Sequence, residues 1–548
     1  MSKIKIFALG GMGENGKNMY GVEIGNDIIL FDAGFKYPDE NMYGIDTVVP
    51  DFTYLKENKE RIKGIFISHG HMDNVGAIND FVTLFPNVTI HGSSTTISMV
   101  NYVLEESNLK SNNMKIIDRF ENVSFGKYSV FAIPLTHSAP GNFGYAVNTK
   151  QGIIFYATDY IFDHSASFNY STDIGKIAYL GKQGVLCLLT ESLQAQKSGH
   201  TSPEHRINDI LSEYFESAGR RAFVMIYSSN YYRIQEVLTE SKSANRKVVI
   251  YGKRLTEIVN NGIKTKVFNF DKKDLVSIFN LDKHIDEDLT IIVSGERDRP
   301  FSGMDKIVKG NDNHLKLTSD DSVLIAASPV PNTELEATKI TDDIYRTGAS
   351  VIEVGKKQVR GNHASKEDVL LMLELLKPKY LIPIKGEYRH QTYVKKAAIS
   401  AMYDENNILM LDNGNVAVFE NKKFSLGADI KVGDVLVDGN TISEGEVVLK
   451  DRELLKENGI IIVSCALNFK NKKIVAGPEV VTRGFIHIQE NREYIELLKN
   501  ESKKIITTAL DESATYNEIQ KAVREQLSLY IYDEKGRRPM IITMLQTL

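Results

Sequence analysis

His69, His71 and Asp73 lie within five residues of one another, with Gly70 between the two histidines. Imidazole nitrogens and carboxylate oxygens are ligands that a borderline metal such as zinc accepts. Gly70 permits a tight turn and a close approach of the backbone to a ligand. The alternative is a pair of surface histidines in a loop, since a short motif can match by chance. The segment therefore indicates a candidate metal site.

The elements that must position these side chains are short strands. The apolar run 64–67 directly precedes His69 and predicts a buried strand. Other polar residues follow predicted strands in the same way: His137 follows 128–134, Asp159 follows 152–156, Glu191 follows 185–189 and Lys385 follows 380–384. Side chains at strand ends lie on a rigid sheet edge, where enzymes commonly place ligands. The repetition favours one composite site.

Length and composition restrict the class of protein. At about 150 residues per domain, 548 residues predict three to four domains, or one large core with additions. The net charge of −5 provides no global basic field, so an RNA-binding surface would be a local patch. Two distant cysteines are typical of a reducing cytoplasm. The chain has no run of about 18 apolar residues and no signal-peptide pattern, so we expect a cytoplasmic protein without a membrane span.

The pattern along the chain predicts an insertion and a separate C-terminal unit. Thr201 and Glu204 fit a capping box, which predicts a helix to about residue 217 and the start of a new α/β segment. Ser365 and Asp368 fit a second capping box. From about 455, strands at 459–467, 485–488 and 540–545 and helices near 491–510 and 516–531 predict a compact α/β domain.

Several motifs carry a family resemblance. The segment 69–73 resembles the HxHxDH signature of the metallo-β-lactamase superfamily, with Asn74 in place of the last histidine. Segments that resemble the ribonuclease J family are 10–19, 68–73, 136–140, 361–365, 378–383, 386–389, 477–480, 483–485 and 537–540. They cover essentially the whole chain, which is identified as a member of that family.

The resemblance implies an α/β fold with three parts. These are a four-layer αββα metallo-β-lactamase core, an inserted α/β β-CASP domain and a small C-terminal α/β domain. The expected boundaries are 1–204 and 346–450 for the core, 205–345 for the β-CASP domain and 451–548 for the C-terminal domain.

The resemblance also implies a zinc centre. His69, His71 and His137 match the histidines of the family's first zinc site, and Asp159 matches the carboxylate that bridges two metals. Asp73 matches a ligand of the second metal and is expected to have a catalytic role.

Two ligand positions of the second metal depart from the family pattern. Asn74 and Lys385 stand where the family has histidines. A carboxamide oxygen is a poor substitute for imidazole, and a protonated lysine has no lone pair. We therefore expect one zinc site, with Lys385 paired to Asp73 or Asp159 near the second position. Alternatively, Lys385 points away and Asn74 ligates weakly.

The resemblance further implies RNA-binding loops and a structural cation. The expected RNA-binding residues are Ser228, Ser229, Asn230, Arg233, Gly361, Asn362, His363, Ala364 and Ser365. His363 is expected near the leaving group, with a catalytic role, and Glu191 is expected to orient a neighbour. Small hydroxyl and amide donors suit phosphate oxygens, although 228–230 could be an ordinary turn. Asp46 and Asp438 match a calcium site of some members.

The implied function is RNA processing and decay, including rRNA processing and mRNA decay. The expected activity is a 5′-to-3′ exoribonuclease and endoribonuclease acting through metal-activated water, weakened by the two ligand changes. Expected partners are single-stranded RNA with a 5′ monophosphate and a second subunit, in a homodimer, a tetramer or a hetero-oligomer with a paralogue. One alternative is a non-catalytic RNA-binding partner of an active paralogue. Another is a small-molecule hydrolase, against which the insertion and the C-terminal domain argue.

Overall fold

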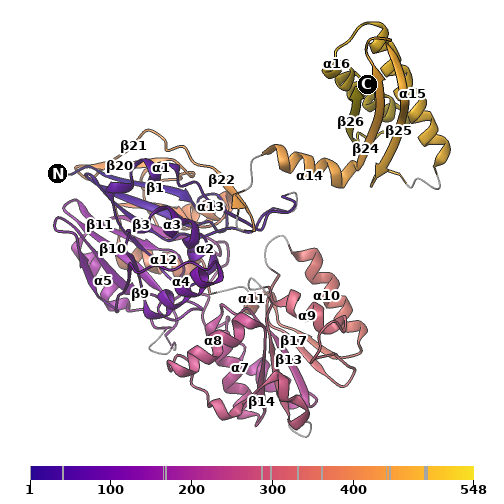
Figure 1. Cartoon of the computed structure of the whole chain (residues 1–548). Coiled ribbons are helices and arrows are strands. Elements are labelled where there is room, and N and C mark those ends of the chain that lie inside the picture. Colours follow the sequence, from indigo (N-terminus) through magenta and orange to yellow (C-terminus); the bar gives the residue numbers. More distant parts are fainter. Residues whose placement is uncertain are drawn as a thin grey trace. The chain divides into compact units, whose positions relative to one another are not determined.

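The structure is a computed structural model that describes most of the chain. The described residues are 2–39, 42–164, 166, 170–284, 288–295, 299–329, 333–359, 362–439, 441–442, 446–486 and 491–547. They form two compact units (Figure 1), Met1–Tyr37 with Thr47–Val435, and Pro38–Asp46 with Leu436–Leu548. Among the described residues, no helix is both long and apolar enough to cross a membrane.

Two sheets form the core of the larger unit. The strands of the first sheet are β1 (Ile4–Gly10), β2 (Met19–Ile24), β3 (Asp27–Phe31), β5 (Ile62–Phe66), β6 (Ile90–Gly92), β7 (Met114–Ile116), β20 (Val416–Glu420) and β21 (Lys423–Leu426), in the order β21-β20-β1-β2-β3-β5-β6-β7. Those of the second sheet are β8 (Asn122–Ser124), β9 (Ser129–Pro134), β10 (Phe143–Thr149), β11 (Gly152–Ala157), β12 (Val185–Glu191) and β19 (Tyr380–Ile384), in the order β19-β12-β11-β10-β9-β8. The short strand β4 (Thr47–Pro50) lies outside both sheets.

Apolar side chains from both sheets pack face to face. Phe31 of the first sheet stacks on Tyr156 of the second, with ring centroids 5.0 Å apart. Both rings belong to one buried cluster that also includes Phe66, Tyr145 and Ile382. Since these side chains come from strands far apart in sequence, their burial holds the two sheets together.

Helices accompany both sheets. They are α1 (Thr53–Glu57), α2 (Met72–Val75), α3 (Ile78–Leu84), α4 (Ser94–Glu106), α5 (Ile174–Gln183), α12 (Lys366–Leu376) and α13 (Tyr388–Ser400). The helices α5, α12 and α13 pack on the second sheet through a second apolar cluster that includes Ile177, Met372 and Val394. Helix α4 contacts β6 and β7 of the first sheet. This arrangement confirms the predicted αββα class.

One predicted capping box forms and the other does not. Helix α12 follows Ser365, whose backbone N–H donates to Asp368 Oδ2 at 3.0 Å. By contrast, the helix predicted after Thr201 begins only at Asn208. The prediction was wrong because Thr201 is bound elsewhere: its N–H donates to Asp368 Oδ2 at 3.0 Å and its hydroxyl to the His363 carbonyl at 2.6 Å.

The inserted domain contains a parallel sheet. Its strands are β13 (Arg221–Met225), β14 (Lys247–Tyr251), β15 (Leu275–Val276), β16 (Leu289–Val293), β17 (Ser322–Ile325) and β18 (Ser350–Glu353), in the order β15-β14-β16-β13-β17-β18. The accompanying helices are α6 (Asn208–Ser217), α7 (Tyr231–Ser243), α8 (Lys253–Lys264), α9 (Pro300–Val308), α10 (Glu334–Arg346) and α11 (Lys356–Val359). Because β18 pairs with β17, the sheet continues beyond residue 345, and the domain boundaries stay a prediction.

The chain reaches the smaller unit along β22 (Asp434–Asp438). The remaining elements are β23 (Thr441–Ile442), α14 (Glu446–Asn458), β24 (Ile460–Asn468), β25 (Lys473–Arg483), α15 (Arg492–Asp511), α16 (Tyr516–Lys535) and β26 (Met540–Thr547), with sheet order β25-β24-β26. The two long helices bury Leu498 and Leu527 against Val463 in one cluster. The strand predicted at 485–488 is wrong for 485–486, and 487–488 lie outside the described residues.

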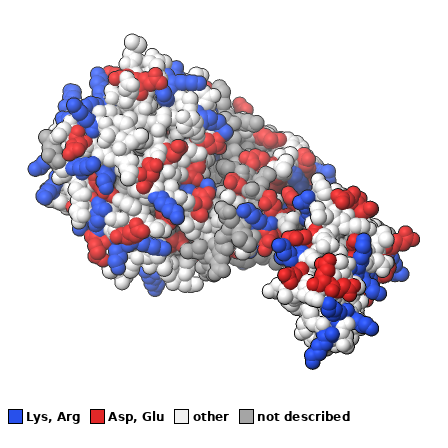
Figure 2. All heavy atoms as spheres, turned by 90° about the horizontal axis from the view of Figure 1, so that it is seen from above, with Lys and Arg blue, Asp and Glu red and all other residues white. Residues whose placement is uncertain are grey.

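Charged side chains of both signs are mixed on the face of the molecule shown in Figure 2. Lysine and arginine alternate there with aspartate and glutamate over short distances. A surface of this kind produces no strong field of a single sign.

Candidate metal centre

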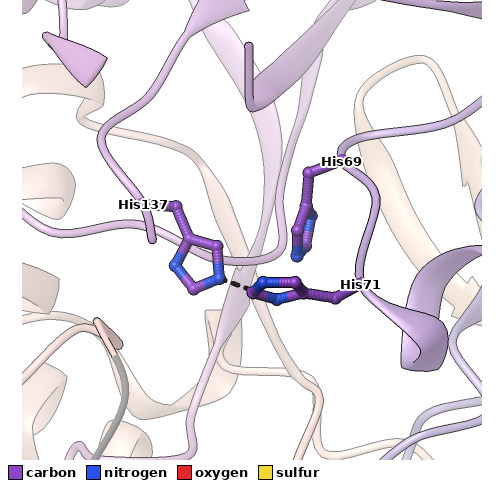
Figure 3. A group of neighbouring side chains, drawn as sticks. All are labelled: His69, His71 and His137. Carbon is purple, nitrogen blue, oxygen red and sulfur yellow. Dashed lines mark hydrogen bonds between the residues drawn. The ribbon is translucent and has the colours of Figure 1, made fainter. Parts of the chain in front are cut away.

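Three imidazole rings converge in the larger unit (Figure 3). His69 and His71 follow β5, and His137 follows β9. The ring centroids of His69 lie 4.5 Å from His71 and 4.8 Å from His137, and those of His71 and His137 are 4.8 Å apart. One nitrogen of each ring lies within 4.8 Å of the other two.

The outer nitrogen of each ring has a partner. His69 Nδ1 lies 2.9 Å from Ser68 Oγ, and His137 Nδ1 lies 2.7 Å from the Asn362 carbonyl. His71 Nε2 lies 3.3 Å from the Ser229 carbonyl. Partners of this kind favour the tautomer whose inner nitrogen offers a lone pair. The inner nitrogens of His71 and His137 lie 3.1 Å apart and share a hydrogen bond (Figure 3), so zinc would have to displace the proton between them.

The inner nitrogens are suited to binding a cation. Burial lowers the pKa of His69 and of His137 well below the usual value, so both rings are neutral. His69 Nε2 makes no hydrogen bond within the described chain and lies 3.4 Å from Asp159 Oδ2. Three lone pairs with a carboxylate beside them fit zinc.

The side chain of Lys385 points into this centre. Its Nζ lies 2.6 Å from Asp159 Oδ1 and 2.7 Å from Asp73 Oδ2, and the residue is only 1% exposed. Burial alone would lower the pKa of Lys385, but the charges of Asp159 and Asp73 raise it above the usual value. The lysine is therefore protonated and has no lone pair. The alternative in which Lys385 points away is wrong.

Asn74 is buried and holds the supporting network. Its Nδ2 donates to Asp32 Oδ2 at 2.8 Å and to Ser68 Oγ at 3.3 Å. The Asp32 carboxylate also accepts from the Ser68 N–H at 2.7 Å and from the Tyr156 hydroxyl at 2.6 Å. The amide thus supports Ser68, which in turn contacts His69. Asn74 Oδ1 has no hydrogen-bond partner within the described residues.

Two supporting residues escaped the sequence reasoning. Tyr156 lies in a strand whose residues are apolar, so its hydroxyl gave no signal. Asn18 donates through Nδ2 to Asp73 Oδ2 at 3.2 Å. Asn18 lies inside the segment 10–19 that resembles the family, and this position in a family motif could have identified it as a supporting residue.

His363 lies on the other side of Asp159. Its Nδ1 is 2.8 Å from Asp159 Oδ1 and 2.8 Å from Glu191 Oε2. Burial alone would lower the pKa of His363, but Glu191 and Asp159 raise it to about 9. Glu191 also accepts the N–H groups of Tyr160 at 2.8 Å and Ala364 at 3.1 Å. It therefore orients His363 and its loop. Asp159, Glu191 and His363 form a second cluster of potential ligands.

The first predicted RNA-binding loop connects β13 to α7. Ser228 is fully buried. The Asn230 side chain accepts from the Arg233 N–H at 2.9 Å and so caps α7. Ser229 contributes its carbonyl to His71, as described above. The loop thus lies beside the histidines, with most of its polar groups already engaged.

Arg233 is buried inside the inserted domain. Its guanidinium is 4% exposed and donates to Glu236 at 2.6 Å and to the carbonyls of His205 at 2.8 Å and Gln358 at 3.0 Å. These bonds hold the charge inside the domain, so an RNA contact by Arg233 stays a prediction that the observed burial does not favour. The sequence alone could not reveal them.

The second predicted loop supports the histidines. Asn362 accepts from His137 through its carbonyl, and its side-chain Nδ2 is buried without a hydrogen bond within the described residues. Ser365 Oγ lies 2.7 Å from Thr201 Oγ1. Gly361 lies outside the described residues.

The predicted calcium site belongs to the smaller unit. Asp438 accepts from the Arg452 guanidinium at 2.8 Å, and Asp46 accepts from the Gly439 N–H at 2.9 Å. A calcium ion there stays a prediction, and an arginine already supplies a positive charge to Asp438.

Four family models match the chain. A beta-lactamase superfamily domain matches residues 27–178, and a ribonuclease J beta-CASP domain matches 219–344. A Zn-dependent metallo-hydrolase RNA specificity domain matches 362–410, and a ribonuclease J C-terminal domain matches 447–548. Zinc and RNA are thus implied by the same matches that identify the domains.

Full-length relatives and one solved structure agree with these matches. The chain is 32% identical to Ribonuclease J2 of Bacillus subtilis, covering 99% of this chain and 98% of that protein. It is also 32% identical to Ribonuclease J 2 of Staphylococcus epidermidis, covering 100% and 98%. A protein of unknown function from Enterococcus faecalis V583 shares the fold, with a TM-score of 0.53 and 14% identity over 76% of this chain and 100% of that one. Matches to known proteins along the whole chain, over a histidine centre of this geometry, show that the chain belongs to the ribonuclease J family.

Proposed function

We propose that this chain hydrolyses RNA in RNA processing and decay, as a 5′-to-3′ exoribonuclease and endoribonuclease with one zinc ion. The observation that supports the proposal is the convergence of His69, His71 and His137 beside Asp159. Zinc held there would supply Lewis acidity and lower the pKa of a water molecule. The intact triad offers no support for a non-catalytic role.

His363 is the proposed proton donor to the leaving oxygen. Its Nδ1 is held by Glu191 and Asp159, and its raised pKa keeps the imidazole protonated at neutral pH. A fixed acid near the departing oxygen is general acid catalysis. Asp73 is the second proposed catalytic group, held by Asn18 and Lys385.

The residues at the second metal position do not fit a metal ion. Lys385 places an ammonium between Asp73 and Asp159, and the Asn74 amide is bound to Asp32. The lysine supplies a fixed positive charge, but an ammonium is not a Lewis acid and cannot lower the pKa of a water molecule as a second metal would. We therefore expect slower hydrolysis than a two-metal site would give.

RNA is proposed to enter beside the histidines as a single strand with a 5′ monophosphate. Ser229 of one loop and Asn362 of the other contact the histidines, which supports a role for the residues around them in binding RNA. Hydroxyl, amide and backbone N–H groups are suitable phosphate ligands.

The smaller unit is proposed to mediate assembly, in a homodimer, a tetramer or a complex with a paralogue in the cytoplasm. Helices α15 and α16 cover one face of its sheet. Val481, Ile542 and Met544 remain exposed. Val481 and Ile542 both pair with Ile462 of the central strand, so they share one side of the sheet. Exposed apolar side chains grouped in this way are typical of contact surfaces.

The test combines zinc content with decay of a 5′-monophosphorylated RNA. We expect about one zinc ion per chain, because His69, His71 and His137 form one complete set of histidine ligands. His137→Ala should remove both zinc and RNA decay, whereas His314→Ala, at an exposed histidine of the inserted domain, should keep both. Absence of zinc from the unmodified chain, or unchanged decay by His137→Ala, would contradict the proposal.

A further inference from the structure

The inserted domain supplies a partner to one of the three histidines. His69 is held by its neighbour Ser68, and His137 by Asn362 of the core. His71 Nε2 instead lies 3.3 Å from the carbonyl of Ser229, in the loop between β13 and α7. His71 Nε2 also lies 3.3 Å from Ser138 Oγ of the core, so the core and the inserted domain together orient His71.

A second contact ties the same loop to His137. The backbone N–H of Tyr232 donates to the Ser138 carbonyl at 3.0 Å, one residue after His137. Ser138 Oγ lies 3.3 Å from His71 Nε2 as well. The Asn230 cap on the Arg233 N–H fixes the turn that presents these groups. The segment thus contacts His71 directly and binds the backbone of the residue next to His137.

We infer that the segment 229–232 of the inserted domain positions the zinc ligands, so that zinc binding and seating of this domain on the core are linked. The inference rests on the zinc site of the proposed function. Loss of a hydrogen-bond partner of a ligating histidine typically weakens metal affinity about 10- to 100-fold. Because linkage is reciprocal, zinc binding must shift the equilibrium between the displaced and the seated segment toward the seated form by the same factor.

A backbone substitution tests the first half of the linkage. Tyr232→Pro removes the N–H that Ser138 accepts, at a position in the first helical turn where proline is tolerated. The Tyr232 ring packs on Tyr170 and His205, so Tyr232→Ala is the matched control that loses the ring and keeps the N–H.

Zinc affinity of the full chain is measured by competition with a chromophoric chelator. We expect Tyr232→Pro to bind zinc at least about tenfold more weakly than Tyr232→Ala, because it lacks one supporting hydrogen bond. Equal affinities of the two variants would overturn the inference.

Amide hydrogen exchange on the unmodified chain tests the second half and does not depend on folding of a variant. Zinc should slow exchange at residues 229–233 and leave Ala244, at the far end of α7, unchanged. Identical exchange with and without zinc overturns the linkage while the zinc site stands. A chain that binds no zinc overturns both this inference and the proposed function.

Discussion

Replacing Lys385 with methionine should destabilise the larger unit in the absence of metal. The ammonium lies 2.6 Å from Asp159 and 2.7 Å from Asp73, and Asp159 is fully buried. Methionine has a similar length but no charge, so a buried carboxylate loses its closest cation. Removing one partner of a buried ion pair costs about 3–5 kcal/mol. His363 remains beside Asp159, which favours the lower end of that range.

The assay is urea unfolding of the full chain with a chelator, followed by circular dichroism. With a slope of about 2–3 kcal/mol per molar urea, the loss lowers the midpoint by about 1–2 M. Lys379→Met is the control, because Lys379 is exposed and its ammonium donates to the Lys422 carbonyl rather than to a carboxylate. An exposed change of this kind should stay within about 0.5 kcal/mol.

Two outcomes would refute the reasoning. In the first, Lys385→Met unfolds at the same urea concentration as the unmodified chain, which means that the carboxylates do not need the ammonium. In the second, added zinc raises the midpoint equally in both proteins. We expect a larger rise in the variant, because a cation that binds only the folded state stabilises it. Without the ammonium, the charge of Asp159 beside His69 strengthens zinc binding at the single histidine site.

Three other predictions follow from the same geometry. The double variant Asn74→His, Lys385→His should raise the metal content from about one to about two ions per chain and speed RNA decay, because imidazoles complete the second ligand set. Either change alone should leave one ion per chain. A double variant that still binds one ion per chain would contradict this prediction. Binding of single-stranded RNA should weaken steeply with salt, because each phosphate contact releases counterions; equal affinity at low and high salt would exclude such contacts. A chain ending at residue 450 should lose self-association, because α15, α16 and the exposed Val481 and Ile542 are then absent; an unchanged mass in solution would refute this role.

The sequence by itself determined which residues gather at the centre. The spacing of His69, His71 and Asp73 is local and was enough to indicate a metal site, and strand ends predicted that His137 and Asp159 lie at the same sheet edge. The resemblance to the ribonuclease J family then implied that His69, His71, His137 and Asp159 act as one ligand set, and the structure brings them together. The helices α15 and α16 were predicted nearly to their bounds, because long amphipathic patterns are local as well. The sequence also showed that Asn74 and Lys385 stand where the family pattern has histidines.

Tertiary structure alone decided how the remaining polar groups are used. Lys385 and Arg233 are both cations beside loops expected to carry function, yet one enters the metal centre and the other is held by Glu236. Thr201 and Ser365 both begin a capping-box pattern, but Thr201 is bound by a carboxylate that lies far along the chain. A buried polar group takes whichever partner the packed fold brings within hydrogen-bonding distance, since leaving it unpaired costs about 1–3 kcal/mol. That partner usually comes from a distant segment, so its identity is a property of the folded chain.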